Sequence, residues 1–335
     1  MYDLELDRVI EKIKDMKAKR VLLQLPDGMR PFAVQMVNAI NMGTDAKVFL
    51  SGNSCYGACD ISIDQARSLA VDLIVHYGHT QYVGDFGIPV LYLRASIDVD
   101  ADQLTVAVAP LLSEYSKIGL ATTVQHVHQI EEIKEKLMLK GVKGLIGGGV
   151  GTTPLDGQIL GCSYGTVIAV KEEVDAYLYI GGGKFHPTGI VMSTGKPVIL
   201  ANPYNGTVSK ITEDDLMDVA KRRMAAVTHA KSAKVFGLLV SSKPGQRKLE
   251  LAEEYASRLN EAGKIAVVIY MDEVRPEHIN NYTEPEILVN TACPRIAIDG
   301  IEGIDRPMIT MNELDVVLGD RKWEDLWGNA YLETA

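Results

Sequence analysis

The chain of 335 residues has few cysteines, no excess of basic residues and no long apolar run. Its 34 Lys and Arg face 44 Asp and Glu, which gives a formal net charge of −10. A protein that binds nucleic acid by neutralising phosphates needs the opposite balance, so we expect no nucleic-acid partner. No run approaches the roughly 18 consecutive apolar residues of a membrane-spanning helix. Residues 1–20 are amphipathic rather than apolar like an export signal, so we expect a cytoplasmic protein without membrane contact.

The four cysteines, Cys55, Cys59, Cys162 and Cys293, are too few for a disulfide framework in a chain of this size. No two of them form the CxxC pair that is typical of structural zinc sites. Cys55 and Cys59 have CxxxC spacing, but Ser62 stands where the CxxxCxxC signature of ordinary radical enzymes requires a third cysteine. Local cysteine motifs are therefore excluded, and any metal site must gather distant residues.

Short apolar runs alternate with helical patterns along the chain, which is typical of parallel sheets covered on both faces by helices. The composition, 47% hydrophobic and 23% charged, is that of an ordinary globular protein. The runs form three groups of four: 20–25, 46–50, 71–77 and 88–93; 116–121, 143–146, 174–180 and 196–200; 233–240, 265–270, 285–290 and 306–310.

The three groups look like an internal repeat. Pro89, Pro197 and Pro307 stand in the fourth run of each group, 108 and 110 residues apart. This period predicts three similar small α/β domains, 1–104, 105–207 and 208–335, each a roughly four-stranded parallel sheet flanked by helices. Ligands of open parallel sheets bind at the carboxyl ends of the strands. A pseudo-three-fold arrangement with these ends turned inward would create one shared central site.

Each predicted domain places one cysteine in a loop after a strand: Cys59, Cys162 and Cys293. Glycine and proline neighbours keep these loops tight. Cys59 precedes a helical run from Ile61, and a helix N-terminus there would favour its thiolate. Three converging thiolates suit an iron–sulfur cluster with one open iron, with zinc as the rival metal. We expect Cys55 not to be a cluster ligand.

Several further segments, together with these cysteines, resemble the archaeal iron–sulfur enzyme of diphthamide biosynthesis, a 2-(3-amino-3-carboxypropyl)histidine synthase. The segments cover nearly the whole chain: 25–28 (LPDG), 55–60 (CYGACD), 122–128 (TTVQHVH), 161–162 (GC), 181–187 (GGGKFHP), 241–246 (SSKPGQ) and 292–295 (ACPR).

The resemblance implies an atypical radical S-adenosylmethionine enzyme in which Cys59, Cys162 and Cys293 hold a [4Fe-4S] cluster. S-adenosylmethionine would bind near the open iron, and one-electron reduction would cleave the bond between its sulfur and the methionine γ-carbon. The resulting 3-amino-3-carboxypropyl group would be transferred to a histidine of translation elongation factor two, with methylthioadenosine as the other product. The resemblance also implies a homodimer and an external electron donor.

Loops after other strands supply candidate contacts for S-adenosylmethionine. Ser242, Gly245 and Gln246 precede a helical run at Lys248, where backbone N–H groups could bind a carboxylate, although an ordinary turn has the same composition.

Gly182 and His186 lie in a glycine-rich loop, and Asp27 lies in a Pro-Asp-Gly turn that is commonly structural. His126 and His128 would share a face of an extended segment, as metal ligands or as hydrogen-bonded structural groups.

Two other functions remain open at this stage. Quinolinate synthase also resembles a three-domain α/β protein with one cluster cysteine per domain, and its open iron would act as a Lewis acid in a dehydration. Alternatively, the chain could be a non-catalytic scaffold subunit that binds the elongation factor or a partner and keeps zinc or a degenerate cluster. The presence of all three cysteines favours a self-sufficient catalyst.

Overall fold

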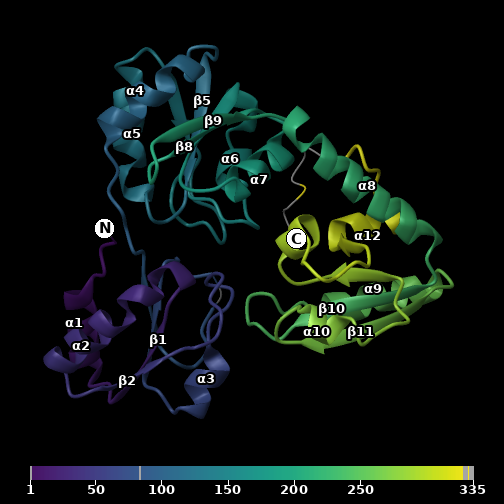
Figure 1. Ribbon diagram of the computed structural model, residues 1–335, viewed down its shortest axis with the longest axis horizontal. Coiled ribbons are helices and arrows are strands. Elements are labelled where there is room, and N and C mark those ends of the chain that lie inside the picture. Colours follow the sequence, from purple (N-terminus) through teal and green to yellow (C-terminus); the bar gives the residue numbers. More distant parts are fainter. Residues whose placement is uncertain (1, 83, 327–330, 332–335) are drawn as a thin grey trace.

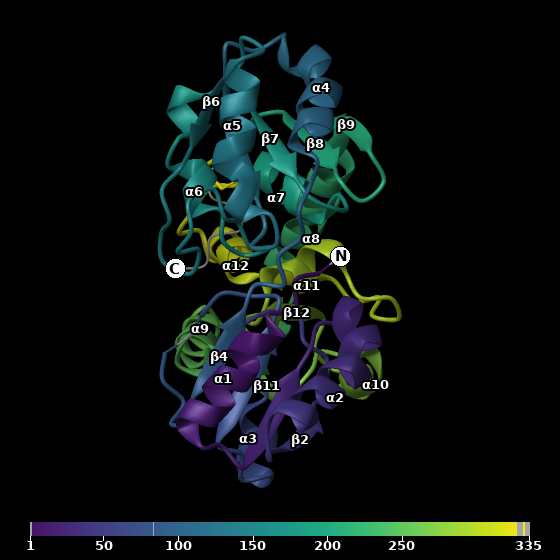
Figure 2. The same cartoon turned by 90° about the vertical axis from the view of Figure 1, so that its left-hand side faces the viewer.

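Three separate β-sheets form the framework of the computed structural model, which describes residues 2–82, 84–326 and 331. Figure 1 shows them in three lobes around a common centre, with the long helix α8 (Met217–Ser232) leading from the second lobe to the third. Figure 2 turns the molecule so that the first and second lobes face the reader. The predicted α/β class with three similar units is confirmed.

The first sheet has the strand order β2-β1-β3-β4, and the third has the equivalent order β11-β10-β12-β13. The second sheet repeats this order as β6-β5-β7-β8 and adds β9 at its edge. All neighbouring strands run parallel except β9, which pairs antiparallel with β8. The strands are β1 (Arg20–Gln24), β2 (Lys47–Leu50), β3 (Leu73–Tyr77), β4 (Val90–Leu93), β5 (Lys117–Thr122), β6 (Lys143–Ile146), β7 (Ala176–Ile180), β8 (Val198–Asn202), β9 (Thr207–Ile211), β10 (Val235–Ser241), β11 (Ile265–Met271), β12 (Ile287–Asn290) and β13 (Met308–Thr310).

Helices cover both faces of the sheets (Figures 1 and 2). Besides α8, they are α1 (Leu6–Met16), α2 (Ala33–Gly43), α3 (Ile63–Ser68), α4 (Ala101–Leu112), α5 (Ile130–Met138), α6 (Gly165–Ile168), α7 (Phe185–Thr194), α9 (Leu249–Glu261), α10 (Pro276–Ile279), α11 (Pro294–Asp299) and α12 (Met311–Leu318). Within the described ranges, no helix combines the length and apolarity that crossing a bilayer requires.

Strand β1 shows why these runs contain consecutive apolar residues. Val21 and Leu23 belong to a core cluster shared with α1 and α2, whereas Leu22 belongs to the cluster shared with α3. Successive side chains of a strand point to opposite faces, so both faces of this sheet are buried. A parallel sheet covered in this way needs apolar residues at almost every position. The twelve predicted runs therefore all correspond to strands.

Strand β9 was not predicted, and its position explains why. It lies at the edge of the second sheet and follows a turn in which Gly206 has φ +70°. Most of its residues are exposed or half-buried, with only Ile211 buried. An edge strand of this kind lacks the continuous apolar run by which the other strands were recognised. The antiparallel pairing of β9 with β8 extends the second sheet to Ile211, the last residue of β9.

One carboxylate in each domain fastens the start of the first strand to the start of the third. Asp72 Oδ2 accepts hydrogen bonds from the backbone N–H groups of Lys19 and Arg20, at 2.7 and 2.9 Å. Asp175 and Glu286 accept from the equivalent backbone groups in the second and third domains, at 2.9 to 3.0 Å. The same contact at equivalent positions supports an internal repeat.

A buried ion pair fixes α8 to the third domain. Arg223 Nε donates to Glu313 Oε1 at 2.9 Å, and Arg223 Nη2 donates to the Met308 carbonyl at 2.8 Å. Glu313 is fully buried and also accepts from the Tyr331 hydroxyl. Tyr331 packs in the core cluster of the second sheet, so this network connects the two domains.

We predict that Arg223→Met lowers the free energy of unfolding by about 3–5 kcal/mol, because it leaves the buried Glu313 carboxylate without its cation. The matched control is Arg222→Met on the exposed side of the same helix, which should change stability by less than about 0.5 kcal/mol. Urea unfolding followed by circular dichroism measures both. Equal midpoints for the two variants would contradict the structural role of the ion pair.

Candidate metal centre

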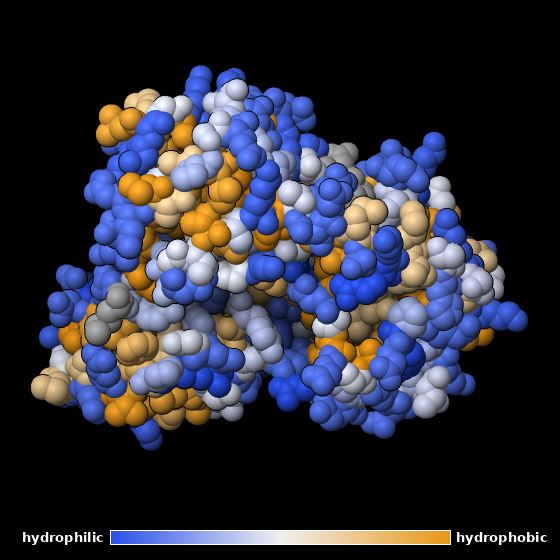
Figure 3. Space-filling model, turned by 45° about the horizontal axis from the view of Figure 1, so that its top comes forward, coloured by the Kyte–Doolittle hydropathy of each residue, from blue (hydrophilic) through white to orange (hydrophobic). Residues whose placement is uncertain are grey.

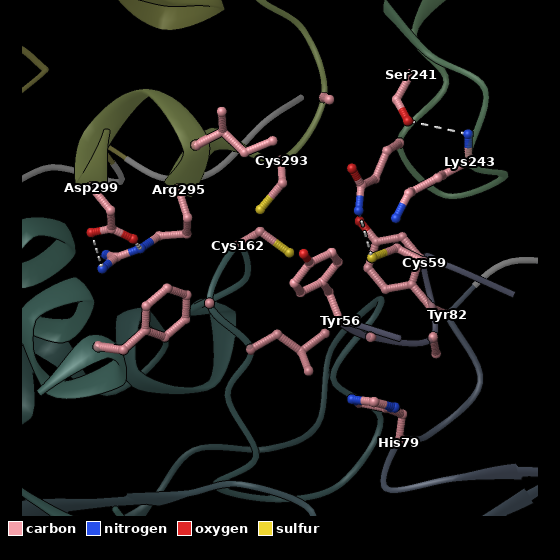
Figure 4. A pocket seen from close by; sticks show the side chains of 18 of the residues that line it. Tyr56, Cys59, His79, Tyr82, Cys162, Ser241, Lys243, Cys293, Arg295 and Asp299 are labelled. Atoms are coloured by element: carbon pink, nitrogen blue, oxygen red, sulfur yellow. Dashed lines mark hydrogen bonds and ion pairs between the residues drawn. The ribbon is translucent and has the colours of Figure 1, made fainter. Parts of the chain in front are cut away.

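A cavity of about 650 Å³ lies where the loops after the strands of the three sheets meet. Figure 3 shows a recess at the centre of the molecule, between the lobes. Cys59, Cys162 and Cys293 all line the cavity, one from each sheet's loops. In Figure 4 their sulfur atoms are turned into the same space. Three cysteines that are far apart in the sequence are therefore gathered at one place.

The loop that carries Cys59 is supported by the third domain. The backbone N–H of Gly245 donates to the Cys59 carbonyl at 2.8 Å. A Cβ at position 245 would lie 2.5 Å from Cys59 Cα and 2.6 Å from Cys59 Cβ. Only glycine permits this approach without moving the Cys59 loop.

The other two cysteines sit at sharp chain reversals. The backbones of Leu160 and Ser163 exchange hydrogen bonds of 2.9 and 3.3 Å, which places Cys162 in a tight turn. Cys293 is the N-cap of α11, and Pro294 is the first residue of that helix. The Asn290 side chain donates to the Cys293 carbonyl at 2.7 Å, which ties the end of β12 to this turn.

Burial favours the protonated thiol at two of the cavity cysteines, Cys59 and Cys293. It raises the pKa of Cys59 to about 11, although the Gln246 amide, which donates to Sγ at 3.3 Å, acts in the opposite direction. Burial also raises the pKa of Cys293. The prediction that a helix N-terminus favours the Cys59 thiolate is wrong, because α3 begins only at Ile63 and desolvation dominates. A metal that binds here must displace protons.

A buried cation also lines the cavity. Arg295 Nε and Nη2 donate to Asp299 at 3.1 and 2.8 Å, and the guanidinium lies 4.0 Å from the ring centre of Phe185. Its Nη1 has no hydrogen-bond partner within the described part of the chain. An unmet buried N–H is costly, and a guanidinium binds carboxylates well. Arg295 therefore places a positive charge in the cavity wall, which would attract an anionic group.

A second buried cation, Lys243, forms ion pairs at the contact between the first and third domains. Lys243 Nζ lies 2.7 Å from Asp60 Oδ2 and 3.2 Å from Glu273 Oε1. Burial acts against it, but hydrogen bonds from Ser54, Arg275 and Lys243 lower the pKa of Glu273 to about 2. Glu273 therefore stays ionised at neutral pH, whereas burial raises the pKa of Asp60 against the pull of Lys243.

Two of the predicted S-adenosylmethionine contacts line the cavity, Gln246 and His186. Burial, with the nearby charge of Arg295, lowers the pKa of His186 to about 4. His186 is therefore a neutral imidazole at physiological pH. Gly245, another predicted contact, instead donates its backbone N–H to the Cys59 carbonyl and so supports the Cys59 loop.

The other predicted contacts lie outside the cavity lining. Ser242 donates to Asp272 Oδ1 at 2.9 Å and lines a neighbouring groove. Gly182 packs against the ring of Tyr204, and Asp27 is an exposed partner of Arg30 at 3.1 Å. A cofactor role for these three residues stays a prediction without support from the geometry.

The predicted extended segment at His126 and His128 is wrong, whereas the alternative that they are hydrogen-bonded structural groups agrees with their contacts. His126 and His128 do not lie on an extended segment, because residues 127–129 form a 3₁₀ turn. His126 bonds the Tyr204 hydroxyl at 2.9 Å, while His128 pairs with Asp98. They are separate structural groups.

The sequence analysis does not single out Arg295 and Lys243, because the burial of a cation leaves no pattern in the sequence. The position of Arg295 two residues after Cys293 was the available signal.

The fold and the cavity together define a class of protein: three α/β domains that each contribute one cysteine to a central site. A family model described as diphthamide synthesis protein matches residues 25–328. The 2-(3-amino-3-carboxypropyl)histidine synthase of Pyrococcus horikoshii is 32% identical over 96% of this chain and 92% of its own length. Subunit 1 of the mouse synthase is 30% identical over 96% of this chain and 73% of its own.

Solved structures agree with the sequence matches. The crystal structure of Dph2 from Pyrococcus horikoshii has a TM-score of 0.87 at 32% identity, covering 96% of this chain and 93% of that one. The structure of the same protein with a 4Fe-4S cluster has a TM-score of 0.86 at 31% identity, covering 96% and 92%. The chain belongs to the diphthamide synthesis family, which confirms the resemblance and decides against quinolinate synthase.

We predict that Gly245→Ala displaces the Cys59 loop. Overpacking of this kind typically costs about 1–3 kcal/mol, so local opening should become roughly 5- to 100-fold more frequent. In metal-free anaerobic protein, alkylation of Cys59 should accelerate accordingly, as read by peptide mass spectrometry. The control is Gly52→Ala, whose Cβ would meet nothing within 4 Å. Equal Cys59 alkylation rates in both variants would contradict the close approach.

Proposed function

We propose that this cavity is the active site of a 2-(3-amino-3-carboxypropyl)histidine synthase, which carries out the first step of diphthamide biosynthesis. The observation that carries the proposal is the meeting of three cysteines from three domains in one cavity, within a chain that belongs to this family. The solved relative from Pyrococcus horikoshii contains a 4Fe-4S cluster.

The residues present fit such a cluster. Three thiols are the number that holds four irons while one iron stays open to an external ligand. Cys59, Cys162 and Cys293 supply them, and Cys55 does not line the cavity. The Gln246 amide already donates to the Cys59 sulfur, and hydrogen bonds to cluster sulfurs are one way in which proteins tune reduction potential.

The cavity also fits S-adenosylmethionine. A volume of about 650 Å³ is in the range for a ligand of this size. The positive charge of Arg295 in the cavity wall would attract the methionine carboxylate, and the neutral His186 imidazole would contact the ligand without repelling its sulfonium charge. Gln246 lies where it can contact both groups, since it lines the cavity beside Cys59.

The bound cluster would supply the single electron that breaks the bond between sulfur and the γ-carbon of the methionine moiety. The chain's own residues would then exclude water from the cavity and keep a protonated hydroxyl near the thiols. Apolar side chains such as Ile159, Leu160 and Val274 line the cavity and exclude water from it. Burial raises the pKa of Tyr82, so its hydroxyl stays protonated near the thiols.

The 3-amino-3-carboxypropyl group would be delivered to a histidine side chain of translation elongation factor two. We place the enzyme in the cytoplasm because its substrate acts in translation. An external electron donor is part of the proposal, because an iron–sulfur cluster must be reduced before it can deliver an electron. A homodimer remains part of the proposal.

Cys59→Ala, Cys162→Ala and Cys293→Ala should each abolish both cluster assembly and turnover, because two thiols cannot hold the cluster. The measurement is anaerobic reconstitution with iron and sulfide, followed by dithionite and S-adenosylmethionine, with products read by chromatography. The parent protein should release methylthioadenosine without 5′-deoxyadenosine. A colourless zinc protein that releases neither product would instead support the scaffold alternative.

Arg295→Met should raise the KM for S-adenosylmethionine by roughly 10- to 100-fold, because a buried charge-assisted contact is worth about 1.5–3 kcal/mol. Cluster absorbance should be unchanged, and Arg222→Met on the exposed face of α8 serves as the control. An unchanged KM in Arg295→Met would remove this residue from the binding site.

A further inference from the structure

Three potential metal ligands meet in the wall of the cavity, apart from the cluster cysteines. One ligand atom each from Cys55, His76 and His79 lies within 4.8 Å of the other two. Cys55 and His76 are buried, and His79 lines the cavity, where Figure 4 shows it below the cysteines. Within the described residues, no other group of histidine, cysteine and carboxylate side chains gathers as closely.

The local fold explains how the two histidines meet. His76 lies in β3, near its carboxyl end, and its imidazole is fully buried. The chain then turns at Gly78, which has φ +85° and whose Cβ would lie 2.9 Å from Pro26. This turn needs glycine, and it brings His79 Nδ1 to 2.9 Å from His76 Nε2. Cys55 reaches them from the loop after β2.

The surrounding hydrogen bonds set the tautomer of His76. Gln24 Oε1 accepts from the backbone N–H of Ser62 at 3.1 Å, while Gln24 Nε2 donates to the Asp60 carbonyl at 2.5 Å. The orientation of the Gln24 amide is thereby defined. His76 Nδ1 lies 3.0 Å from Gln24 Oε1, so Nδ1 must carry the proton. Its Nε2 then presents a lone pair toward His79 and Cys55.

This is the arrangement that metal-binding histidines show in proteins. Such a ligand donates its other ring N–H to a carbonyl or carboxylate, which orients the ring and raises its basicity. Both imidazoles are neutral, as ligands must be: burial lowers the pKa of His76 well below its usual value and that of His79 to about 4. Burial raises the pKa of Cys55 to about 12, so this residue is a thiol before an ion binds.

We propose that Cys55, His76 and His79 form a second metal site, which binds one divalent ion of the zinc class. Imidazole and thiolate together select borderline ions such as Zn²⁺ over Mg²⁺ or Ca²⁺. Binding converts the Cys55 thiol to a thiolate and releases one proton to solvent, while the proton on His79 Nδ1, which donates to His76 Nε2, is replaced by one on His79 Nε2, so the metal–ligand unit carries a charge of +1. Asp60, whose charge acts on Cys55, offsets part of it. The proposed site borders the cavity at His79, which provides an entry path for the ion.

The required rearrangement is small. Tetrahedral zinc with bonds of about 2.0–2.1 Å to nitrogen and about 2.3 Å to sulfur needs ligand separations of roughly 3.3 Å between nitrogens and roughly 3.6 Å from sulfur to nitrogen. The two rings would separate by about 0.4 Å from their present 2.9 Å. The sulfur would approach by at most about 1.2 Å from within 4.8 Å. Small changes in side-chain torsion angles would accomplish both.

The first test isolates this site from the cluster thiols. In a background of Cys59→Ser, Cys162→Ser and Cys293→Ser, Co²⁺ should bind at about one ion per chain and produce a thiolate-to-cobalt charge-transfer band. Adding Cys55→Ser should remove the band, and adding His79→Gln should weaken Co²⁺ binding at least tenfold. The control His128→Gln, whose imidazole pairs with Asp98, should leave the band unchanged. Thermal melting checks that each variant is folded.

The second test uses the cluster-loaded enzyme, so that a folding failure of the multiple variant does not decide the matter. After incubation with Zn²⁺ and a brief chelator wash, elemental analysis should find about one zinc beside the cluster iron. Cys55→Ser should lose the zinc and keep the iron. Folded protein that binds no Co²⁺ or Zn²⁺, or an unchanged metal content in Cys55→Ser, overturns the proposal. The outcome is independent of whether the enzyme transfers the aminocarboxypropyl group.

Discussion

The central cavity depends on one constraint: three separate sheets must hold their strand ends against one another. The contacts that do this lie at the cavity wall. Gly245 holds the Cys59 loop through its backbone, and Lys243 pairs with Asp60 across the same boundary. Arg295 lies over Phe185 between the third and second domains, and the Gln158 side chain reaches Thr80 between the second and first at 2.9 Å. Each pair of domains is therefore joined beside the site.

Desolvation is the second effect that shapes the chemistry. It raises the pKa of the Cys59 and Cys293 thiols and lowers that of His186 and His79, which favours the neutral form of all four groups. Charge is confined to pairs such as Lys243 with Asp60, and to Arg295, which keeps one N–H unused. Such a cavity suits a metal group whose positive ions pair with thiolates. It also suits a ligand with an anionic end that pairs with Arg295, because each buried charge then has a partner.

Part of this architecture could be predicted because it leaves a period in the sequence. Strands with two buried faces, such as β1, are continuous apolar runs, and their threefold recurrence gave the fold class and the strands of all three sheets. Strand β9 has one exposed edge and no such run, so it was missed. The site residues divide in the same way. Cys59, Cys162 and Cys293 were recognised by residue type and position after strands, whereas Arg295 and Lys243 depend on burial, which no local pattern shows.

The two histidine pairs show which contacts could not be predicted from the sequence. His126 and His128 have a suggestive spacing, but a 3₁₀ turn separates their side chains. His76 and His79 were not singled out, yet a glycine turn brings their nitrogens to 2.9 Å and a loop from another strand adds Cys55. Sequence alone determined the repeat, the strands and the three cysteines, because burial of both sheet faces and thiol chemistry depend on residue type. Only the tertiary structure decided which side chains share a site, because contacts across domains depend on how three sheets pack, and that packing leaves no period along the chain.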